Sequence, residues 1–491
     1  MLFNSLQFIV FFPTVAAVYY LLPHRYRWLI LLVASSYFYM VFVPKYILVI
    51  FTLILVDYVL GICIENAESQ RKKFYLVGSI FANLGILFIF KYFNFFNGIF
   101  AGFAELWHLN YPIGTLTLLL PLGLSFHVFQ SLSYVIEVYR GRQKAEHDLR
   151  IYALYVMFFP QLVAGPIERP YHLLHQFKDI HLFDYGRTVS GLRIILWGFF
   201  KKLIIADTAA IGVNHIFNSA HQLDGLTLIA GAVLFSYQLY GDFSGYSDIA
   251  VGSARILGFD LINNFDRPYA SRSISEFWRR WHISLSSWLR DYLYYPLVLG
   301  RKQITRARLY MSIMITFVLI GLWHGANWTY ILMGALHGWY LVFGAASRPW
   351  RDKFIHLLKT FKLSILTSGF QVVATFALVS FGWVFFRAPT LNEAWYYISH
   401  LGSGLSQAYS LSYLKFIFSE SSLGLTRVKL ALLLFAIVAL ELVQYARAHN
   451  LLGKYFFQQP YWVRWGLQYA LIFLILYFAN SGAQPFIYFQ F

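Results

Sequence analysis

Apolar residues occur along this chain in long runs that are separated by short polar or basic loops. A helix needs about 20 apolar residues to cross the hydrocarbon core of a bilayer. The pattern therefore predicts an all-α, polytopic membrane protein with about 11–12 transmembrane helices. The runs lie at residues 5–22, 28–43, 46–63, 74–100, 113–139, 189–209, 226–257, 309–323, 328–346, 370–386, 428–446 and 464–480.

Residues 151–166 do not fit a plain span. The segment is short, contains Pro160 and Pro166, and lies between stretches of basic residues. Irregular backbone at membrane depth has to be covered by protein or lie at the membrane surface. We therefore expect a re-entrant or interfacial segment.

The run 226–257 is longer than one crossing requires, and its middle is polar. Residues 240–248 read Tyr-Gly-Asp-Phe-Ser-Gly-Tyr-Ser-Asp. Two carboxylates, Asp242 and Asp248, and two glycines at membrane depth favour a helix that breaks where it lines a polar cavity. An alternative of equal weight is that both carboxylates only pair with buried arginines.

Basic residues fall on alternate loops between the runs. The loops 101–112, 210–225 and 324–327 contain no Lys or Arg, and the loop near residue 44 has only Lys45. The positive-inside rule makes the basic loops cytoplasmic and places both termini outside. It also explains the net charge of +17, so nucleic acid is not an expected partner. The basic loops carry Arg25 and Arg27, residues 71–73, residues 140–150, residues 348–362, and Arg447 with Lys454.

Composition agrees with a single integral-membrane domain over residues 1–491, surrounded by lipid. Hydrophobic residues make up 59% of the chain and charged residues 12%, whereas soluble domains carry about 25% charged residues. The single cysteine, Cys63, excludes an intramolecular disulfide and a cysteine-based zinc site. No Lys or Arg precedes the first apolar run, so we expect a retained span rather than a cleaved signal peptide.

The most informative stretch is Gly-Leu-Trp-His-Gly (321–325), which places His324 at the far end of the apolar run Leu309–Trp323. A helix that starts at the basic boundary would lift this histidine roughly 22 Å into the core, toward the outer side. An ionisable group at that depth is a functional hypothesis, and a neutral imidazole can take a proton from a hydroxyl or thiol. The alternative is a core histidine that neighbouring carbonyls satisfy. If the helix continues, Asn327 shares its face and could orient the ring or the substrate.

His337 is a tempting partner for His324, but a continuous helix would separate the two by about 20 Å. A histidine dyad is therefore disfavoured unless the backbone breaks at Gly325, and a two-histidine zinc site is disfavoured for the same reason. The chain has no His-Glu-x-x-His motif, no Gly-x-Ser-x-Gly elbow and no Walker loop. We expect no metal.

Residues 273–291 can be placed on one amphipathic helix, capped by Ser273 or Ser275. A helix with a tryptophan face and a cationic face is typical of an anchor at the membrane boundary. The functional alternative is that the cationic face binds a phosphate or pyrophosphate of a cytoplasmic donor. The apolar face carries Phe277, Trp281, Leu285 and Trp288, and the polar face carries Arg279, His282, Ser286 and Arg290.

The connection 388–427 is the longest loop assigned to the outside. It is polar and rich in Ser and Tyr, with few basic residues. Loops of this length usually carry function or their own structure, so it is a candidate docking surface for an extracytoplasmic partner.

Five motifs in this order resemble the membrane-bound O-acyltransferases. Within that family the chain is most similar to the bacterial alginate O-acetyltransferase branch, which is related to the D-alanyl transfer protein of teichoic acid modification. The resemblance covers nearly the whole chain. The motifs are Pro-Leu-Gly-Leu-Ser-Phe-His-Val-Phe-Gln (121–130), Phe-Pro-Gln-Leu-Val-Ala-Gly-Pro-Ile (159–167), Gly-Asp-Phe-Ser-Gly-Tyr-Ser-Asp (241–248), Phe-Trp-Arg-Arg-Trp-His-Ile-Ser-Leu-Ser-Ser-Trp-Leu-Arg-Asp-Tyr (277–292) and Gly-Leu-Trp-His-Gly (321–325).

The resemblance implies that His324 is the catalytic histidine and His282 the second important histidine. It also implies that an acyl group leaves a cytoplasmic thioester, crosses the protein and passes to a polysaccharide or a partner transferase. The chain departs from the family pattern at Leu-Val-Leu-Gly-Arg (297–301), where many relatives carry a Gly-Gly-Asn-Arg turn, and at His127, where an aromatic residue is common.

We therefore expect a membrane-bound O-acyltransferase of the bacterial cytoplasmic (inner) membrane. The expected donor is an acyl thioester such as acetyl-CoA, with no bound cofactor, and the expected acceptor is an exported polysaccharide reached through an extracytoplasmic acetyltransferase. Expected substrate-binding residues are Asn327, Arg279, Arg290, Asp242 and Trp323.

Two rival hypotheses belong to other classes. A transporter would use Asp242, Asp248 and His324 as a proton relay, but the inverted repeats typical of transporters are not evident. A lipid-linked sugar transferase ranks last, because it would need paired carboxylates near a metal. Asp242 and Asp248 do not face each other on a regular helix.

Overall fold

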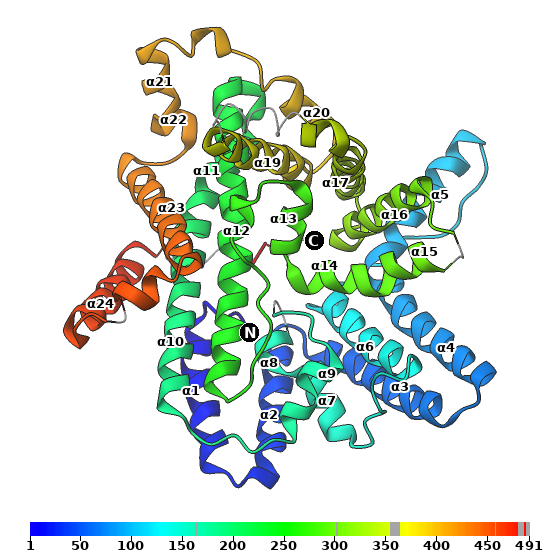
Figure 1. Ribbon diagram of the computed structural model, residues 1–491. Coiled ribbons are helices and arrows are strands. Elements are labelled where there is room, and N and C mark those ends of the chain that lie inside the picture. Colours follow the sequence, from blue (N-terminus) through cyan, green and yellow to red (C-terminus); the bar gives the residue numbers. More distant parts are fainter. Residues whose placement is uncertain (163–164, 301–302, 354–363, 457, 480–485, 488–491) are drawn as a thin grey trace.

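The computed structural model describes residues 1–162, 165–300, 303–353, 364–456, 458–479 and 486–487 (Figure 1). These residues form helices and connecting loops and contain no strand, which confirms the all-α prediction. The α-helices of the first half are α1 Leu6–Leu21, α2 His24–Met40, α3 Ile47–Asn66, α4 Ser69–Leu87, α5 Phe93–Leu106, α6 Leu124–Tyr139, α7 Leu149–Met157, α8 Phe159–Leu162, α9 Pro170–Leu173, α10 Tyr185–Phe199, α11 Asp207–Asn218 and α12 Gly225–Ile256. Those of the second half are α13 Ile274–Arg280, α14 Ile283–Leu289, α15 Tyr295–Leu299, α16 Arg306–His324, α17 Trp328–Ala346, α19 Ser364–Arg387, α20 Leu391–Ser399, α21 Leu411–Ile417, α22 Glu420–Leu423, α23 Arg427–Ala448 and α24 Tyr461–Phe478.

Seven helices of the described residues are long and apolar enough to cross a membrane. Every one of the dozen predicted runs contains a helix, but α1, α2, α6 and α10 are shorter than these seven. The helix α12 is almost wholly buried by other helices, so protein rather than lipid surrounds it. The seven are Pro44–Asn66, Ser69–Leu106, Arg306–His324, Trp328–Ala346, Thr367–Arg387, Arg427–Ala448 and Tyr461–Phe478.

The centre of the molecule is the long helix α12, which packs along α10 and α11 (Figure 1). The prediction that this helix breaks at its glycines is wrong, because α12 is continuous over 32 residues. Its glycines serve close packing instead. A Cβ at Gly245 would lie 2.8 Å from the Gly198 carbonyl oxygen, and one at Gly241 would lie 2.9 Å from the Lys201 carbonyl oxygen. The helix α12 can approach α10 and the segment after it this closely only because glycine has no side chain.

The acidic residues of α12 are neutralised by lysines from a π-helical segment, Phe200–Ala206, that joins α10 to α11. Lys201 Nζ lies 2.8 Å from Asp248 Oδ2, and Lys202 Nζ lies 2.7 Å from Asp242 Oδ1 and 2.9 Å from Asp207 Oδ1. The alternative that Asp242 and Asp248 form buried ion pairs is therefore confirmed, although the cations are lysines rather than arginines. Paired charges need no broken helix to solvate them.

Part of the run 113–139 is not helical. Residues 109–121 have no regular secondary structure, and α6 begins only after Gly123, whose φ is 71°. Proline at 112 and 121 removes backbone donors, and α5 supplies replacement hydrogen bonds to the loop. Asn94 both donates to the Leu116 carbonyl and accepts from the Leu116 N–H, each at 2.8 Å.

The expected single helix over 273–291 is two helices. α13 ends at Arg280, α14 begins at Ile283, and His282 between them adopts a left-handed conformation with φ 44°. Asn264 holds this break, because its carbonyl accepts the Ile283 N–H at 2.9 Å. Ser273 caps α13 as predicted, accepting the Glu276 N–H. The break turns His282 inward, away from the arginine face.

The segment 151–166 and the connection 388–427 agree in part with the predictions made for them. Residues 151–162 form the short helices α7 and α8, which are buried in protein, so the segment is not one long span. Residues 163–164 and Arg301, which belonged to two of the predicted features, lie outside the described residues. The connection 388–427 has structure of its own, with α20, α21 and α22 (Figure 1).

Candidate active site

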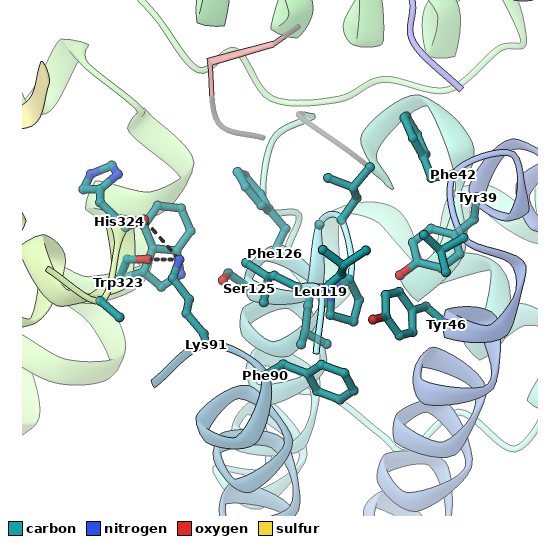
Figure 2. A pocket seen from close by; sticks show the side chains of 17 residues that line it. Tyr39, Phe42, Tyr46, Phe90, Lys91, Leu119, Ser125, Phe126, Trp323 and His324 are labelled. Atoms are coloured by element: carbon teal, nitrogen blue, oxygen red, sulfur yellow. Dashed lines mark hydrogen bonds between the residues drawn. The ribbon is translucent and has the colours of Figure 1, made fainter. Parts of the chain in front are cut away.

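A cavity of about 490 Å³ lies beside the end of α16. In Figure 2, His324, Trp323 and Lys91 stand on one side, and Tyr39, Phe42 and Tyr46 stand opposite. Segments that are far apart in the chain thus line one cavity: the end of α2, the π-helical turn Phe88–Tyr92, residues 119–126, and the end of α16. This volume falls within the range of about 300–1,000 Å³ that is typical of small-molecule sites.

His324 is the last residue of α16. The helix ends there because Gly325 is extended and Asn327 caps the next helix, accepting the Thr329 N–H at 3.0 Å. The His324 side chain is buried, and its ring lies 5.2 Å from the ring of Phe386 between centroids. A histidine at a helix end beside a cavity can meet a ligand without disturbing the helix.

The chain reverses after His324, so α17 packs back against α16. The two separate apolar runs predicted this break, and the condition of a continuous helix, under which Asn327 would share the face of His324, is not met. Gly321 makes the reversal possible, because a Cβ there would lie 2.2 Å from the Tyr330 carbonyl oxygen. His337 on α17 is buried, and its Nδ1 accepts from Trp278 Nε1 at 3.3 Å.

His282 lies next to the cavity wall without lining it. It is fully buried, with its ring 4.6 Å from Phe243 and 5.9 Å from Trp323 between centroids. Burial lowers the pKa of the His282 imidazole well below its usual range, and the nearby His324 lowers it further. The ring is therefore neutral, with one nitrogen able to accept a hydrogen bond and the other able to donate one.

Trp323 joins three of the sequence motifs. Its ring lies 5.4 Å from Phe126 and 5.7 Å from Phe129, and Phe129 stacks on Trp288 at 4.1 Å. Trp288 Nε1 also donates to the Phe129 carbonyl at 2.8 Å. The motifs at 121–130, 277–292 and 321–325 therefore form one aromatic wall, which fixes where the histidines stand.

The structure brings together only some of the predicted site residues. His324 and Trp323 line the cavity, and His282 lies behind Trp323. Arg279 and Arg290 are exposed on the segment that precedes α16, and Arg290 Nε donates to Asp291 Oδ1 at 2.8 Å.

Two more predicted substrate-binding residues have structural partners instead. Asp242 pairs with Lys202 and accepts the Ile487 N–H at 2.6 Å, whereas Asn327 caps α17 and donates to the Pro389 carbonyl at 3.1 Å. Neither residue lines the cavity.

No group of three or more metal-ligating side chains occurs within the described part of the chain. His127, the residue that departs from the family pattern, is buried, and its Nδ1 lies 3.1 Å from the Val156 carbonyl oxygen.

Sequence reasoning missed Lys91, Tyr39 and Tyr46. The signal for Lys91 was present, because it is a lysine inside the apolar run 74–100. A charged residue within a span is a functional hypothesis in its own right. The tyrosines gave no comparable signal in a chain that contains 36 of them.

The fold and the cavity define a multi-pass helical membrane protein with two buried histidines at an internal aromatic wall. A family model of the membrane-bound O-acyltransferases matches residues 146–386, which include both histidines. The chain is 40% identical over 404 residues to the probable alginate O-acetylase AlgI of Azotobacter vinelandii, covering 80% of this chain and 77% of that protein. It is 39% identical over 404 residues to the protein of that name from Pseudomonas aeruginosa, covering 80% and 74%.

A relative with a different printed acceptor is the peptidoglycan O-acetyltransferase of Helicobacter pylori, 33% identical over 429 residues, which cover 80% of this chain and 78% of that protein. This chain belongs to the membrane-bound O-acyltransferase family and is a membrane-bound acyltransferase. The resemblance predicted from the motifs is confirmed. Membership of an enzyme family leaves the transporter hypothesis without support.

Proposed function

We propose that the protein transfers a small acyl group, acetyl, from a cytoplasmic thioester to a hydroxyl group of an exported polysaccharide, directly or through an extracytoplasmic partner transferase. The relatives named for alginate and peptidoglycan acetylation support an acetyl group and a polysaccharide acceptor. The observation that carries the proposal is the position of His324, buried at a helix end in the wall of a cavity.

In this proposal His324 is the general base. It accepts the proton of the acceptor hydroxyl while the hydroxyl oxygen attacks the thioester carbonyl. The new C–O ester bond forms as the C–S bond breaks, and the imidazolium returns the proton to the leaving thiolate. General base catalysis of this kind contributes typically about 10²–10⁴-fold in rate.

The cavity is the acceptor side of the reaction. Ala326 lies in a loop that the distribution of basic residues assigns to the outside, and Tyr46 and residues 119–123 follow two further such loops. The donor, acetyl-CoA, then approaches from the opposite side. There the His282 ring lies 5.9 Å from the Trp323 ring between centroids, and we assign it as the second histidine of the reaction. The protein works in the bacterial inner membrane, where cytoplasmic thioesters and exported glycans meet.

The test is replacement of His324 by Ala, followed by mass spectrometry of the acyl content of exported glycans. We expect acylation to fall at least 100-fold while the protein stays folded in the membrane. The control is His449→Ala, because His449 is exposed just after the end of α23. Normal acylation by the His324→Ala protein would show that His324 is not the base. The mass of the transferred group tests whether it is acetyl.

A further inference from the structure

The end of α16 lies inside the protein, where its last carbonyl groups cannot rely on water. An α-helix leaves its final four carbonyls without partners in the helix. Here they belong to Gly321, Leu322, Trp323 and His324, and the Gly325 N–H reaches only the first of them. The other three need donors from elsewhere, since a buried carbonyl without a partner is costly.

Two consecutive side chains supply all three donors. Tyr92 Oη donates to the Leu322 carbonyl at 3.1 Å. Lys91 Nζ donates to the Trp323 carbonyl at 2.7 Å and to the His324 carbonyl at 3.1 Å (Figure 2). The ammonium also faces the negative end of the α16 dipole and lies 5.9 Å from the centre of the Trp323 ring. Every carbonyl of the last turn is thereby satisfied.

Both donors come from the π-helical turn Phe88–Tyr92 within the continuous helix 69–106. A π-helical turn is a local widening of an α-helix and occurs frequently at functional sites. In this turn the two neighbouring side chains both reach the same helix end. The turn lies outside residues 146–386, so it belongs to a part of the chain that the family model does not match.

We propose that Lys91, assisted by Tyr92, is a positioning residue for acyl transfer. The carbonyls of Trp323 and His324 belong to the peptide groups on either side of the His324 Cα atom. One ammonium group therefore holds both peptide planes and so sets the direction in which the imidazole leaves the backbone. The inference rests on the proposed role of His324 as the base.

Positioning predicts a particular kinetic signature. A misplacement of about 1 Å at a reacting group can cost about 100-fold in rate. We expect Lys91→Met to lower kcat roughly 10- to 100-fold and to leave the KM for acetyl-CoA unchanged, because the donor approaches from the side opposite the cavity. Lys91→Arg should recover most of this loss, since a guanidinium can also donate to two carbonyls.

The assay measures transfer of radiolabelled acetyl from acetyl-CoA in vesicles of cells that express the full chain and acetylate their exported polysaccharide. Tyr92→Phe is the second variant, because it removes a hydroxyl and keeps the ring. The loss of one hydrogen bond there should lower kcat about 2- to 10-fold. The matched control is Lys45→Met, an exposed lysine on the neighbouring turn Pro44–Tyr46, which should leave the rate unchanged.

The inference is overturned if Lys91→Met keeps the wild-type kcat, and a wild-type kcat of Tyr92→Phe removes the assisting role of Tyr92. It is equally overturned if Lys91→Met raises KM at constant kcat, since Lys91 would then bind substrate rather than hold the base. His324→Ala separates this inference from the proposed function. If His324→Ala is active, His324 is not the base. If His324→Ala is inactive and Lys91→Met is fully active, the role of His324 stands and only the role of Lys91 is refuted.

Discussion

The buried lysine Lys202 allows a stability prediction that follows directly from geometry. It is 1% exposed and bridges Asp242 and Asp207, which are 3% and 2% exposed. Lys202→Met would leave two carboxylates in a protein interior without their cation. Removing one partner of a buried pair typically costs about 3–5 kcal/mol, because the remaining charge is not compensated. We expect the free energy of unfolding to fall by that amount.

The matched control is Arg150→Met. Arg150 forms an ion pair of the same length, 2.7 Å to Asp148, but the two side chains are 56% and 30% exposed. An exposed pair is worth about 0–1 kcal/mol, so this change should be nearly neutral. Equilibrium unfolding of the purified protein in mixed detergent, followed by the fluorescence of its 14 tryptophans, measures both variants. Equal losses for the two would refute the argument that burial decides the cost.

Two further predictions concern other parts of the fold. Gly245→Ala should lower the free energy of unfolding by about 1–3 kcal/mol, because the new Cβ would meet the facing carbonyl of α10 at 2.8 Å. Gly78→Ala is its control, with open space around it, and should be neutral or stabilising in the same unfolding measurement. The hydrogen bond to Glu168 raises the pKa of His172. The pair therefore stabilises the protein fully below about pH 6.5, the usual pKa of histidine. This stabilisation is lost as the pH rises through the raised pKa. The difference in thermal stability between the wild-type protein and His172→Gln should therefore shrink from pH 5 to pH 9, and a difference that is constant with pH would contradict this.

Helices and their approximate bounds could be predicted from the sequence, because apolar runs report burial in lipid or protein directly. How the helices meet could not be. Gly241 and Gly245 looked like breaks in a helix, yet they are places where α10 and the following π-helical segment approach α12 closely. The same residue type serves both purposes, and only the neighbouring helix decides between them.

The two histidines of the candidate site were predicted from the sequence, but most of the residues that line the cavity were not. His324 was found because it ends an apolar run, but the reversal at Gly325 depends on the fit of α17 against Gly321. His282 was assigned to the cationic face because a regular helix was assumed through a residue that is in fact left-handed. Periodicity cannot show a break of one residue, since the residues on each side keep their own helical pattern.

The two buried lysines, Lys91 and Lys202, have different partners, and this gives their substitutions different consequences. Lys202 faces two carboxylates, whereas Lys91 donates to two neutral carbonyls. Removing Lys91 leaves no uncompensated charge, so its cost in stability should be about 1–3 kcal/mol, less than for Lys202. Its cost in rate should be larger, because its partners flank the proposed base. Lys202→Met is thus expected to lose more stability and Lys91→Met more kcat, and the reverse order would contradict both assignments.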